Sequence, residues 1–381
     1  MTNLVKIGGV EIGAGRPVAI QSMAKTDTRD AEATAVQIRE LQDVGCEIMR
    51  VAVPDMAAAT AVGDIRRRID IPLVADIHFD YRLALECIRQ GADKIRINPG
   101  NIGDDARVRQ VADAARERGV PIRIGVNGGS LDRDLLRKYG GVTSEALCES
   151  AVNQAEALNM HGFYDIVVSI KASDVKRTVE ACLLFDEKNT GIPQHIGLTE
   201  AGTPTGGLVK STIAIYELLR RGVGDTLRIS LTGDPVDEVL AAKTLLRTFE
   251  TMRADERGPD GKTGAGAGAE MTVFSAENAV KGMRLGGVEV ISCPTCGRCK
   301  TDMIEIVKVV EKRVNFIKTD KHIKVAIMGC AVNGPGEARE ADVGAACGDG
   351  AALIFKRGEP LYKAPQAELA DALLREIYEM L

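Results

Sequence analysis

The strongest constraint on the fold is an alternation of short β-branched runs with longer amphipathic segments, which repeats eight times along the first two-thirds of the chain. Each longer segment can place its apolar residues on one face of a helix. The runs lie at residues 18–23, 47–53, 73–78, 94–98, 122–127, 166–171, 195–200 and 227–231. The helical segments lie at residues 31–44, 57–68, 81–90, 104–118, 144–159, 175–189, 208–221 and 236–248.

Repeated strand–helix units indicate parallel strands joined by right-handed crossovers. Eight such units in about 250 residues predict an α/β protein built on a closed (β/α)8 TIM barrel. An open, doubly wound sheet is the alternative architecture. No GxGxxG follows a strand run, so the sequence does not support dinucleotide binding.

Residues 255–270, DERGPDGKTGAGAGAE, interrupt this pattern with Gly, Ala and charged residues. The Gly-Lys-Thr at 261–263 suggests a phosphate loop, but the required first Gly would fall at position 256, which is Glu256. A flexible linker or surface insertion is the better interpretation. We therefore predict a substrate-binding barrel at 1–254, a linker at 255–270 and a smaller domain at 271–381.

The smaller domain is predicted to be α+β. Strand candidates lie at 288–292, 323–328 and 352–355, and helix candidates at 302–314 and 366–381. The first two strands run directly into cysteine-containing loops, so these loops are expected at the strand ends.

Two cysteine clusters mark those loops: Cys293-Pro-Thr-Cys296-Gly-Arg-Cys299, and Cys330 within GCAVNGPGE. A Cys-x-x-Cys pair alone fits zinc, a redox dithiol or an iron–sulfur centre. A zinc ribbon usually has a second Cys-x-x-Cys, which is missing here. Three thiolates instead suit a [4Fe–4S] cluster. This reasoning leaves the fourth ligand open, as Cys299, Cys347, Glu337 or the substrate.

Polar residues recur at the ends of the predicted barrel strands, where TIM-barrel enzymes carry their chemistry. They are Arg50, Asp76, His78, Arg96, Asn98, Arg123, Asn127, Ser169, Lys171, Glu200 and Ser230. Side chains alternate along a strand, so Arg96 with Asn98, and Ser169 with Lys171, share a face. Buried cations without anions are costly, which predicts an anionic ligand such as a diphosphate. A metal site at Asp76 and His78 is a weaker alternative.

The composition excludes several other functions. A net charge of −5 and a pI of about 5.6 argue against nucleic acid and membrane-surface partners. Neither a signal peptide nor a stretch of roughly 20 apolar residues is present, so we expect a cytoplasmic protein. Clustered cysteines then indicate metal or redox chemistry. Four scattered thiols are expected to be inert core residues: Cys46, Cys87, Cys148 and Cys182.

Both cysteine motifs resemble the signature of the bacterial 4-hydroxy-3-methylbut-2-en-1-yl diphosphate synthase family. The barrel motifs MRV at 49–51, ADIHFD at 75–80, KIRINPGN at 94–101 and LTEAG at 198–202 resemble it too. The likeness spans nearly the whole chain apart from 255–270. Cys299 departs from the family pattern, because the family does not need it as a ligand.

The resemblance implies the penultimate step of the methylerythritol phosphate route to isoprenoids. The substrate would be 2-C-methyl-D-erythritol 2,4-cyclodiphosphate, which two electrons convert to the allylic diphosphate and water. A [4Fe–4S] cluster would be held by Cys293, Cys296, Cys330 and Glu337, with reduced flavodoxin or ferredoxin as the donor. Members are homodimers in which the cluster domain of one subunit caps the barrel of the other.

Roles for the barrel residues follow from this chemistry. Arg50, Arg96, Arg123 and Lys171 are expected to hold the diphosphate, with hydroxyl donors from Ser169 and Ser230. Glu200 is the candidate for proton handling at the departing oxygen. Asp76, His78, Asn98 and Asn127 are expected to orient the substrate or its neighbours. Two alternatives are a zinc-containing barrel lyase or transferase with Lys171 as a Schiff-base lysine, and a non-enzymatic ribbon module.

Overall fold

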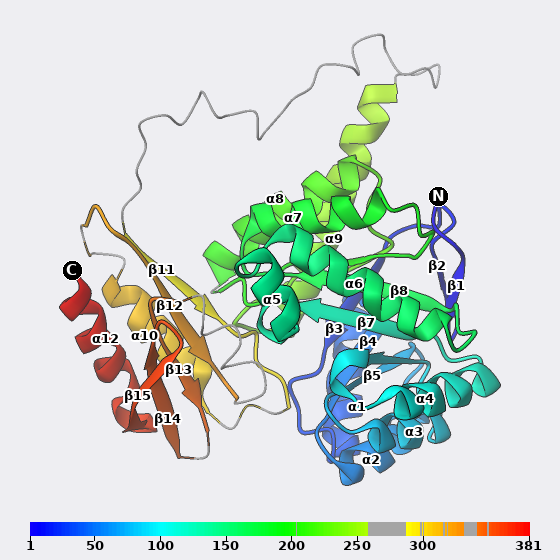
Figure 1. The fold of residues 1–381 in the computed structure, drawn as a ribbon, viewed down its shortest axis with the longest axis horizontal. Coiled ribbons are helices and arrows are strands. Elements are labelled where there is room, and N and C mark those ends of the chain that lie inside the picture. The colour runs from blue at the N-terminus through cyan, green and yellow to red at the C-terminus, as the bar shows by residue number, and fades with distance from the viewer. Residues whose placement is uncertain are drawn as a thin grey trace.

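The computed structural model describes residues 1–202, 204–257, 287–297, 299, 301–314, 317, 319–330, 341–348 and 350–381. Eight parallel strands form one sheet in the order β8-β7-β6-β5-β4-β3-β10-β9 (Figure 1). They are β3 (Ala19–Met23), β4 (Ile48–Val53), β5 (Leu73–Ile77), β6 (Lys94–Ile97), β7 (Ile122–Asn127), β8 (Ile166–Lys171), β9 (His195–Ile196) and β10 (Thr226–Leu227). An isolated bridge between Val168 and Gln194 links the two end strands, so the predicted barrel is confirmed and nearly closed.

Helices cover the outside of this barrel (Figure 1). They are α1 (Ala31–Asp43), α2 (Met56–Arg66), α3 (Tyr81–Arg89), α4 (Asp105–Arg118), α5 (Arg133–Tyr139), α6 (Ser144–Asn159), α7 (Val175–Asp186), α8 (Pro204–Arg220) and α9 (Pro235–Arg257). Aspartate side chains cap several helix starts; Asp30, for example, accepts from the amide of Ala33. Such caps satisfy amides that have no partner within the helix, which fixes where each helix begins.

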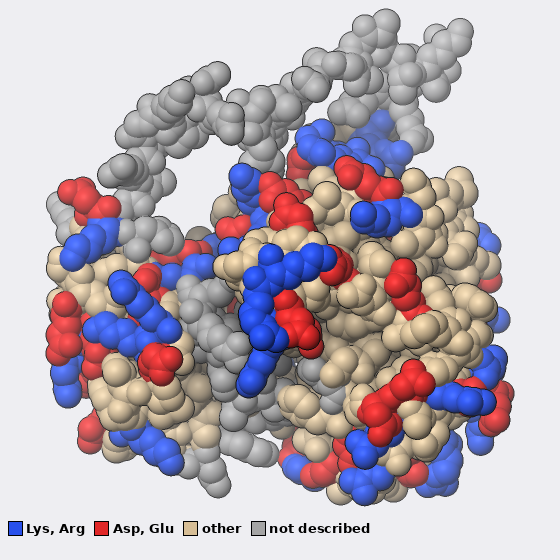
Figure 2. Space-filling view, viewed as in Figure 1, with Lys and Arg blue, Asp and Glu red and all other residues tan. Residues whose placement is uncertain are grey.

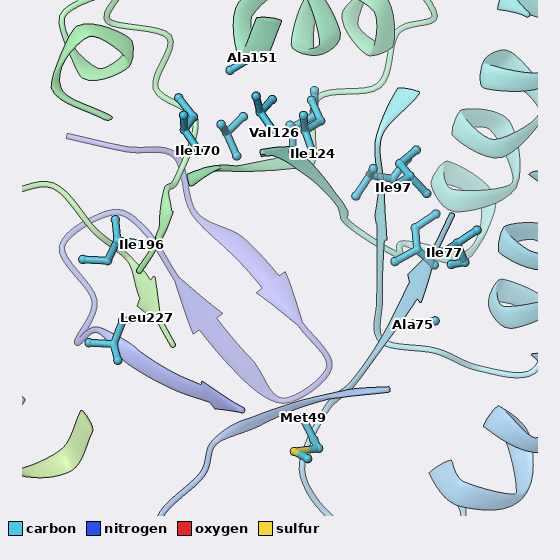
Figure 3. Packing of buried hydrophobic residues seen from close by; sticks show 14 of the residues in the cluster. Met49, Ala75, Ile77, Ile97, Ile124, Val126, Ala151, Ile170, Ile196 and Leu227 are labelled. Carbon is cyan, nitrogen blue, oxygen red and sulfur yellow. The ribbon is translucent and has the colours of Figure 1, made fainter. Parts of the chain in front are cut away.

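The outward faces of the barrel strands supply most of the core. Figure 3 shows Ile77, Ile97, Ile124 and Ile170 in this layer, with Ala151 of α6 packed nearby. The N-terminal end of the barrel is covered differently. A hairpin of β1 (Val5–Ile7) and β2 (Val10–Ile12) packs an apolar cluster onto it. Its barrel members are Ala19, Ile48, Val74 and Val167.

A separate five-stranded sheet forms the C-terminal domain, in the order β11-β12-β13-β14-β15. Its strands are β11 (Gly287–Ser292), β12 (His322–Met328), β13 (Val343–Cys347), β14 (Ala351–Lys356) and β15 (Glu359–Pro365). The first three strands are parallel and the last two antiparallel. Helices α10 (Met303–Val314) and α12 (Leu369–Met380) share one apolar cluster with this sheet (Figure 1).

The C-terminal sheet contacts the carboxyl end of the barrel. Ala201, after β9, forms a parallel bridge with Ser292 of β11. Thr232, after β10, lies 2.6 Å from Ser292 Oγ and donates to the carbonyl oxygen of Cys293 at 3.1 Å. Lys210 of α8 pairs with Glu289 of β11 at 2.5 Å. These contacts bring the first cysteine loop to the barrel mouth.

Most of the predicted elements are confirmed, with four omissions. The sequence reasoning missed the β1–β2 hairpin, helix α5 and strands β13 and β15. It also overestimated β9 and β10, which have two residues each. Helix α9 continues to Arg257, three residues beyond the predicted barrel boundary at 254. No helix among the described residues has both the length and the apolar character needed to cross a bilayer.

Candidate active site

One pocket lies between the barrel mouth and the cysteine loops, and both domains contribute side chains to it. The barrel residues that line it are Met23, Arg50, Asp76, His78, Arg96, Arg123, Asn127, Ser169, Lys171, Leu198, Thr199, Glu200, Arg228 and Ser230. The C-terminal domain contributes Cys293, Pro294, Thr295, Cys296, Met328, Gly329 and Cys330. The predicted strand-end cations and the predicted cysteines therefore meet in one place.

Buried cations dominate the barrel side of the pocket. Arg123 is 1 % exposed, and its Nε and Nη1 have no hydrogen-bond partner among the described residues. Burial, and then the neighbouring Arg123, Arg50 and Arg228, hold the pKa of Lys171 well below its ordinary value. Burial likewise lowers the pKa of Arg50 to about 10. Buried positive charges that lie close together are unfavourable, and a bound anion reduces this cost. Guanidinium groups also match the geometry of diphosphate oxygens.

On the β5–β6 side of the pocket, Asp76 forms a hydrogen-bonded network with Arg96 and His78. Arg96 Nη1 donates to Asp76 Oδ1 at 3.2 Å and lies 3.1 Å from His78 Nε2. Burial alone would raise the pKa of Asp76, but His78, Arg96 and Arg50 together hold it well below its ordinary value. Asp76 is therefore a carboxylate that orients Arg96 and His78 toward the ligand space.

Gly125 of β7 makes room for the Arg96 guanidinium. Arg96 Nη2 donates to the carbonyl oxygen of Gly125 at 3.1 Å. A Cβ on residue 125 would lie 2.1 Å from Arg96 Nε and 2.6 Å from Cζ. The absence of a side chain at this position is thus what allows Arg96 to cross the face of β7.

Glu200 occupies a strained position at the carboxyl end of the barrel. It is 1 % exposed and has a φ of 53°, in the left-handed region that non-glycine residues rarely adopt. Its negative charge contributes to raising the pKa of Cys293, which places it beside the first cysteine loop. Strained, buried residues of this kind concentrate at functional sites.

The cysteine loops are held by close backbone contacts. Gly329 N–H donates to Cys293 Sγ at 3.2 Å. A Cβ on residue 329 would lie 2.7 Å from Cys299 Sγ and 3.1 Å from Cys293 Sγ, so only glycine fits between the two thiols. Thr295, between Cys293 and Cys296, has a φ of 61°. The loop is therefore shaped around its sulfur atoms.

These residues fit an iron–sulfur centre by the chemistry of their donors. Cys293, Cys296 and Cys330 face one pocket, and burial raises the pKa of Cys293 well above its ordinary value. A buried thiolate needs nearby positive charge, which a metal centre supplies. Among the described residues, no three His, Cys, Asp or Glu side chains are grouped closely enough to hold a single ion. Cluster ligands bind separate irons, so they do not converge on one point.

Three predicted cysteine-domain residues are placed differently or not at all. Glu337 lies outside the described residues. Cys299 does not line the pocket; its thiol donates to the carbonyl oxygen of Thr301 at 3.2 Å. Cys347 is buried on β13, and its thiol contacts Met303 Sδ at 3.8 Å. The scattered thiols Cys46 and Cys182 are buried, and burial raises the pKa of each to about 12.

Asn98 is the one predicted barrel residue that does not line the pocket. Its strand ends at Ile97, and its side chain accepts from the amide of Gly100 at 3.1 Å. Conversely, the sequence reasoning missed Arg228, whose Nη2 lies 3.1 Å from Glu238 Oε2. Arg228 lies two residues before the predicted Ser230, so both point to the same face of the predicted strand. Strand alternation could therefore have identified Arg228 from the sequence.

The fold and this pocket define a two-domain protein of one class: a TIM barrel whose cationic mouth faces the cysteine loops of a second, smaller domain. Residues 2–243 match the GcpE TIM-barrel domain and residues 289–379 match the GcpE protein C-terminal domain. The chain belongs to the GcpE family, which confirms the resemblance seen in its motifs.

Close relatives span both domains. A "4-hydroxy-3-methylbut-2-en-1-yl diphosphate synthase (flavodoxin)" of Caldanaerobacter subterraneus is 50 % identical over 100 % of this chain and 97 % of its own. The protein of the same name from Clostridium tetani is 49 % identical over 98 % of this chain and 97 % of its own. That from Geobacter sulfurreducens is 48 % identical over 100 % of this chain and 98 % of its own.

Proposed function

We propose that this chain is an oxidoreductase of isoprenoid biosynthesis that converts 2-C-methyl-D-erythritol 2,4-cyclodiphosphate to (E)-4-hydroxy-3-methylbut-2-enyl diphosphate. Two electrons enter, the ring C–O bond to phosphate opens, and a hydroxyl takes up a proton and leaves as water. The observation that carries this proposal is the pocket itself, in which a buried cationic barrel mouth faces three cysteines. The names of the full-length relatives agree with it.

The cations and hydroxyls of the barrel bind and orient the substrate. Arg50, Arg96, Arg123 and Lys171, together with Arg228, surround the diphosphate, and Arg123 has two unpartnered donors for its oxygens among the described residues. Hydroxyl donors from Ser169 and Ser230, together with Asn127, lie in the same pocket. Because Arg96, Arg123 and Arg228 are buried, their attraction to phosphate is screened little by water.

Glu200 is proposed to deliver the proton that the departing hydroxyl needs. It lines the pocket between the barrel cations and the first cysteine loop. This position lets its carboxyl group act as a general acid at the departing hydroxyl.

The proposed cofactor is a [4Fe–4S] cluster held by Cys293, Cys296, Cys330 and Glu337. When bound, this cluster supplies the two electrons one at a time. Three cysteines on one pocket, and a glycine at 329 that lets the backbone approach Cys293 Sγ and Cys299 Sγ closely, support a metal-binding role for the loop. The zinc-containing lyase with a Lys171 Schiff base is not favoured, because the relatives share the name of a reductive enzyme.

Further proposals concern partners and organisation. The donor is reduced flavodoxin, as the relatives' names suggest, with ferredoxin as the alternative. The enzyme is a homodimer in the cytoplasm, where nine free cysteines suit a reducing compartment. The division into 1–254, 255–270 and 271–381 is supported by the family matches at 2–243 and 289–379.

Metal analysis tests the cofactor and the function together. Protein purified or reconstituted without oxygen is expected to contain four iron and four sulfide per chain, and to reduce the cyclic diphosphate when a reductant is supplied. Cys293→Ser is expected to lose the iron and the activity. Cys299→Ser is the matched control and should keep both. A wild-type protein without iron or sulfide after reconstitution, or one that holds zinc instead, contradicts the proposal.

A further inference from the structure

Below the substrate pocket, the barrel interior holds a polar layer that plays no part in the proposed mechanism. It consists of Gln21 of β3, Lys94 of β6 and His195 of β9, none of which lines the pocket. Lys94 precedes Arg96 by two residues on the same strand face, so its side chain also points into the barrel. In the sheet register Lys94 pairs with Val74, a member of the apolar cluster under the β1–β2 hairpin, so it lies toward the N-terminal end of the barrel.

Lys94 is the most unusual member of this layer. It is 0 % exposed, and its Nζ has no hydrogen-bond partner among the described residues. His195 is equally buried; its Nδ1 lies 2.7 Å from Thr226 Oγ1, whereas its Nε2 has no partner in the described part of the chain. An ammonium group in this position would be a buried charge with nothing to balance it, which is strongly unfavourable.

The charged groups that face Lys94 make its protonation harder still. Burial holds the pKa of Lys94 well below its ordinary value, and the positive charges of Arg123 of β7 and Arg50 of β4 lower it further. Across the barrel, burial lowers the pKa of His195, and Lys171 and Arg123 lower it further. The positive charges around Lys94 therefore oppose its protonation.

Two buried acids near these cations, Asp76 and Glu238, are already paired with other cationic groups. Asp76 of β5 pairs with Arg96 and His78. Glu238 of α9 pairs with Arg228 at 3.1 Å. A bound diphosphate changes this balance, because it brings negative charge to the guanidinium groups that otherwise repel a proton from Lys94.

We propose that Lys94 is a neutral amine in the empty barrel and takes up one proton from solvent when a diphosphate group occupies the pocket above it. The step forms an N–H bond and transfers no electron. It rests on the proposed function, since it requires the pocket to bind a diphosphate. Lys94 touches no ligand atom and acts through the electrostatic field of Arg123 and Arg50. Its consequence is that the enzyme binds diphosphates more tightly as the pH falls.

Calorimetry of inorganic diphosphate binding tests this coupling. Titrations at one pH in two buffers with different ionisation enthalpies give the number of protons taken up. Wild type is expected to take up about one proton more than Lys94→Met, a variant of similar length that cannot be protonated. Across one pH unit, the wild-type association constant should therefore change by up to about tenfold more than that of the variant. Lys6→Met, on an exposed position of β1, is the control and should match wild type.

Two outcomes overturn the proposal. One is diphosphate binding by wild type with no proton uptake; the other is equal uptake by wild type and Lys94→Met. Failure of wild type to bind either inorganic diphosphate or the enzymatic product would instead refute the anion pocket, and the proposed function with it.

The stability of two variants gives a second and independent readout. If Lys94 is neutral, Lys94→Met should keep the wild-type melting temperature at neutral pH. Lys94→Arg should lower it, because arginine stays charged when buried. The reverse order, with arginine tolerated and methionine destabilising, would show a charged Lys94 and overturn the proposal.

Discussion

Substitution of Gly125 by alanine is the sharpest test of how the pocket is built. The φ of Gly125 is not in the left-handed region, so an alanine backbone is unstrained there. The added Cβ would nevertheless lie 2.1 Å from Arg96 Nε and 2.4 Å from Nη2. Contacts this short cannot exist, so the guanidinium group must leave its place. One methyl group on β7 thus displaces a cation of β6 without removing it.

The expected size of the effect follows from the bonds that Arg96 loses. Arg96 donates to Asp76 at 3.2 Å and to the carbonyl oxygen of Gly125 at 3.1 Å. In the proposed complex Arg96 also donates to the diphosphate, and a hydrogen bond to a charged group contributes about 1.5–3 kcal/mol. Loss of one such bond to the ligand weakens binding by about 10- to 150-fold. The dissociation constant of inorganic diphosphate and the KM for the cyclic substrate should both rise within this range.

A double-mutant cycle separates this mechanism from general damage to the barrel. Arg96→Met should weaken binding by a similar factor, because it removes the same cation. In that background Gly125→Ala should add little, since methionine leaves room for the new methyl group. If Gly125→Ala bound diphosphate like wild type, or if the two effects simply added, the steric argument would be refuted.

Three further predictions concern other parts of the site. Glu200→Gln should lower kcat by about 10²- to 10⁴-fold while the dissociation constant of diphosphate stays near wild type; full turnover would exclude the proton role. Thr232→Val removes two hydrogen bonds between the domains, at 2.6 Å and 3.1 Å, and should raise amide hydrogen exchange in β11, whereas Thr232→Ser should not. Asp76 has a lowered pKa in the folded state, so its stabilising contribution is present above its unfolded value of about 3.8 and is lost as the pH falls through the lower folded value. Asp76→Asn should therefore flatten the acid limb of the unfolding curve, and an unchanged limb would contradict this assignment.

The barrel and most of the barrel residues that line the pocket could be predicted from the sequence because strand alternation controls both. Several inward-facing polar residues lie two positions from another, as Arg96 does from Lys94 and Lys171 from Ser169. The same rule failed for Asn98, because β6 ends one residue earlier and the chain turns there. Strand alternation predicts which face of the sheet a side chain points to, but it does not predict the residue at which the strand ends.

The missed elements lacked the patterns on which sequence reasoning depends. Strands β1 and β2 have three residues each, too few to establish a period. Strand β13, VGAAC, is rich in small residues, and β15, EPLYKAP, contains two prolines that disfavour interior strands. Gly125 and Gly329 depend on side chains distant in sequence, so only the folded chain reveals why they must be glycine.

The pairing of β11 with β12 has a consequence for electron transfer. Ser292 and Ile327 are register partners on these neighbouring parallel strands, so Cys293 and Cys330 follow from the same edge of one hydrogen-bonded sheet. The backbone spacing between such strands is about 4.8 Å and resists change. Sheet pairing up to Ser292 and Ile327 therefore limits how far the two cysteine loops can move apart. A scaffold that barely moves when an electron arrives has a small reorganisation energy, which favours rapid one-electron steps in either direction.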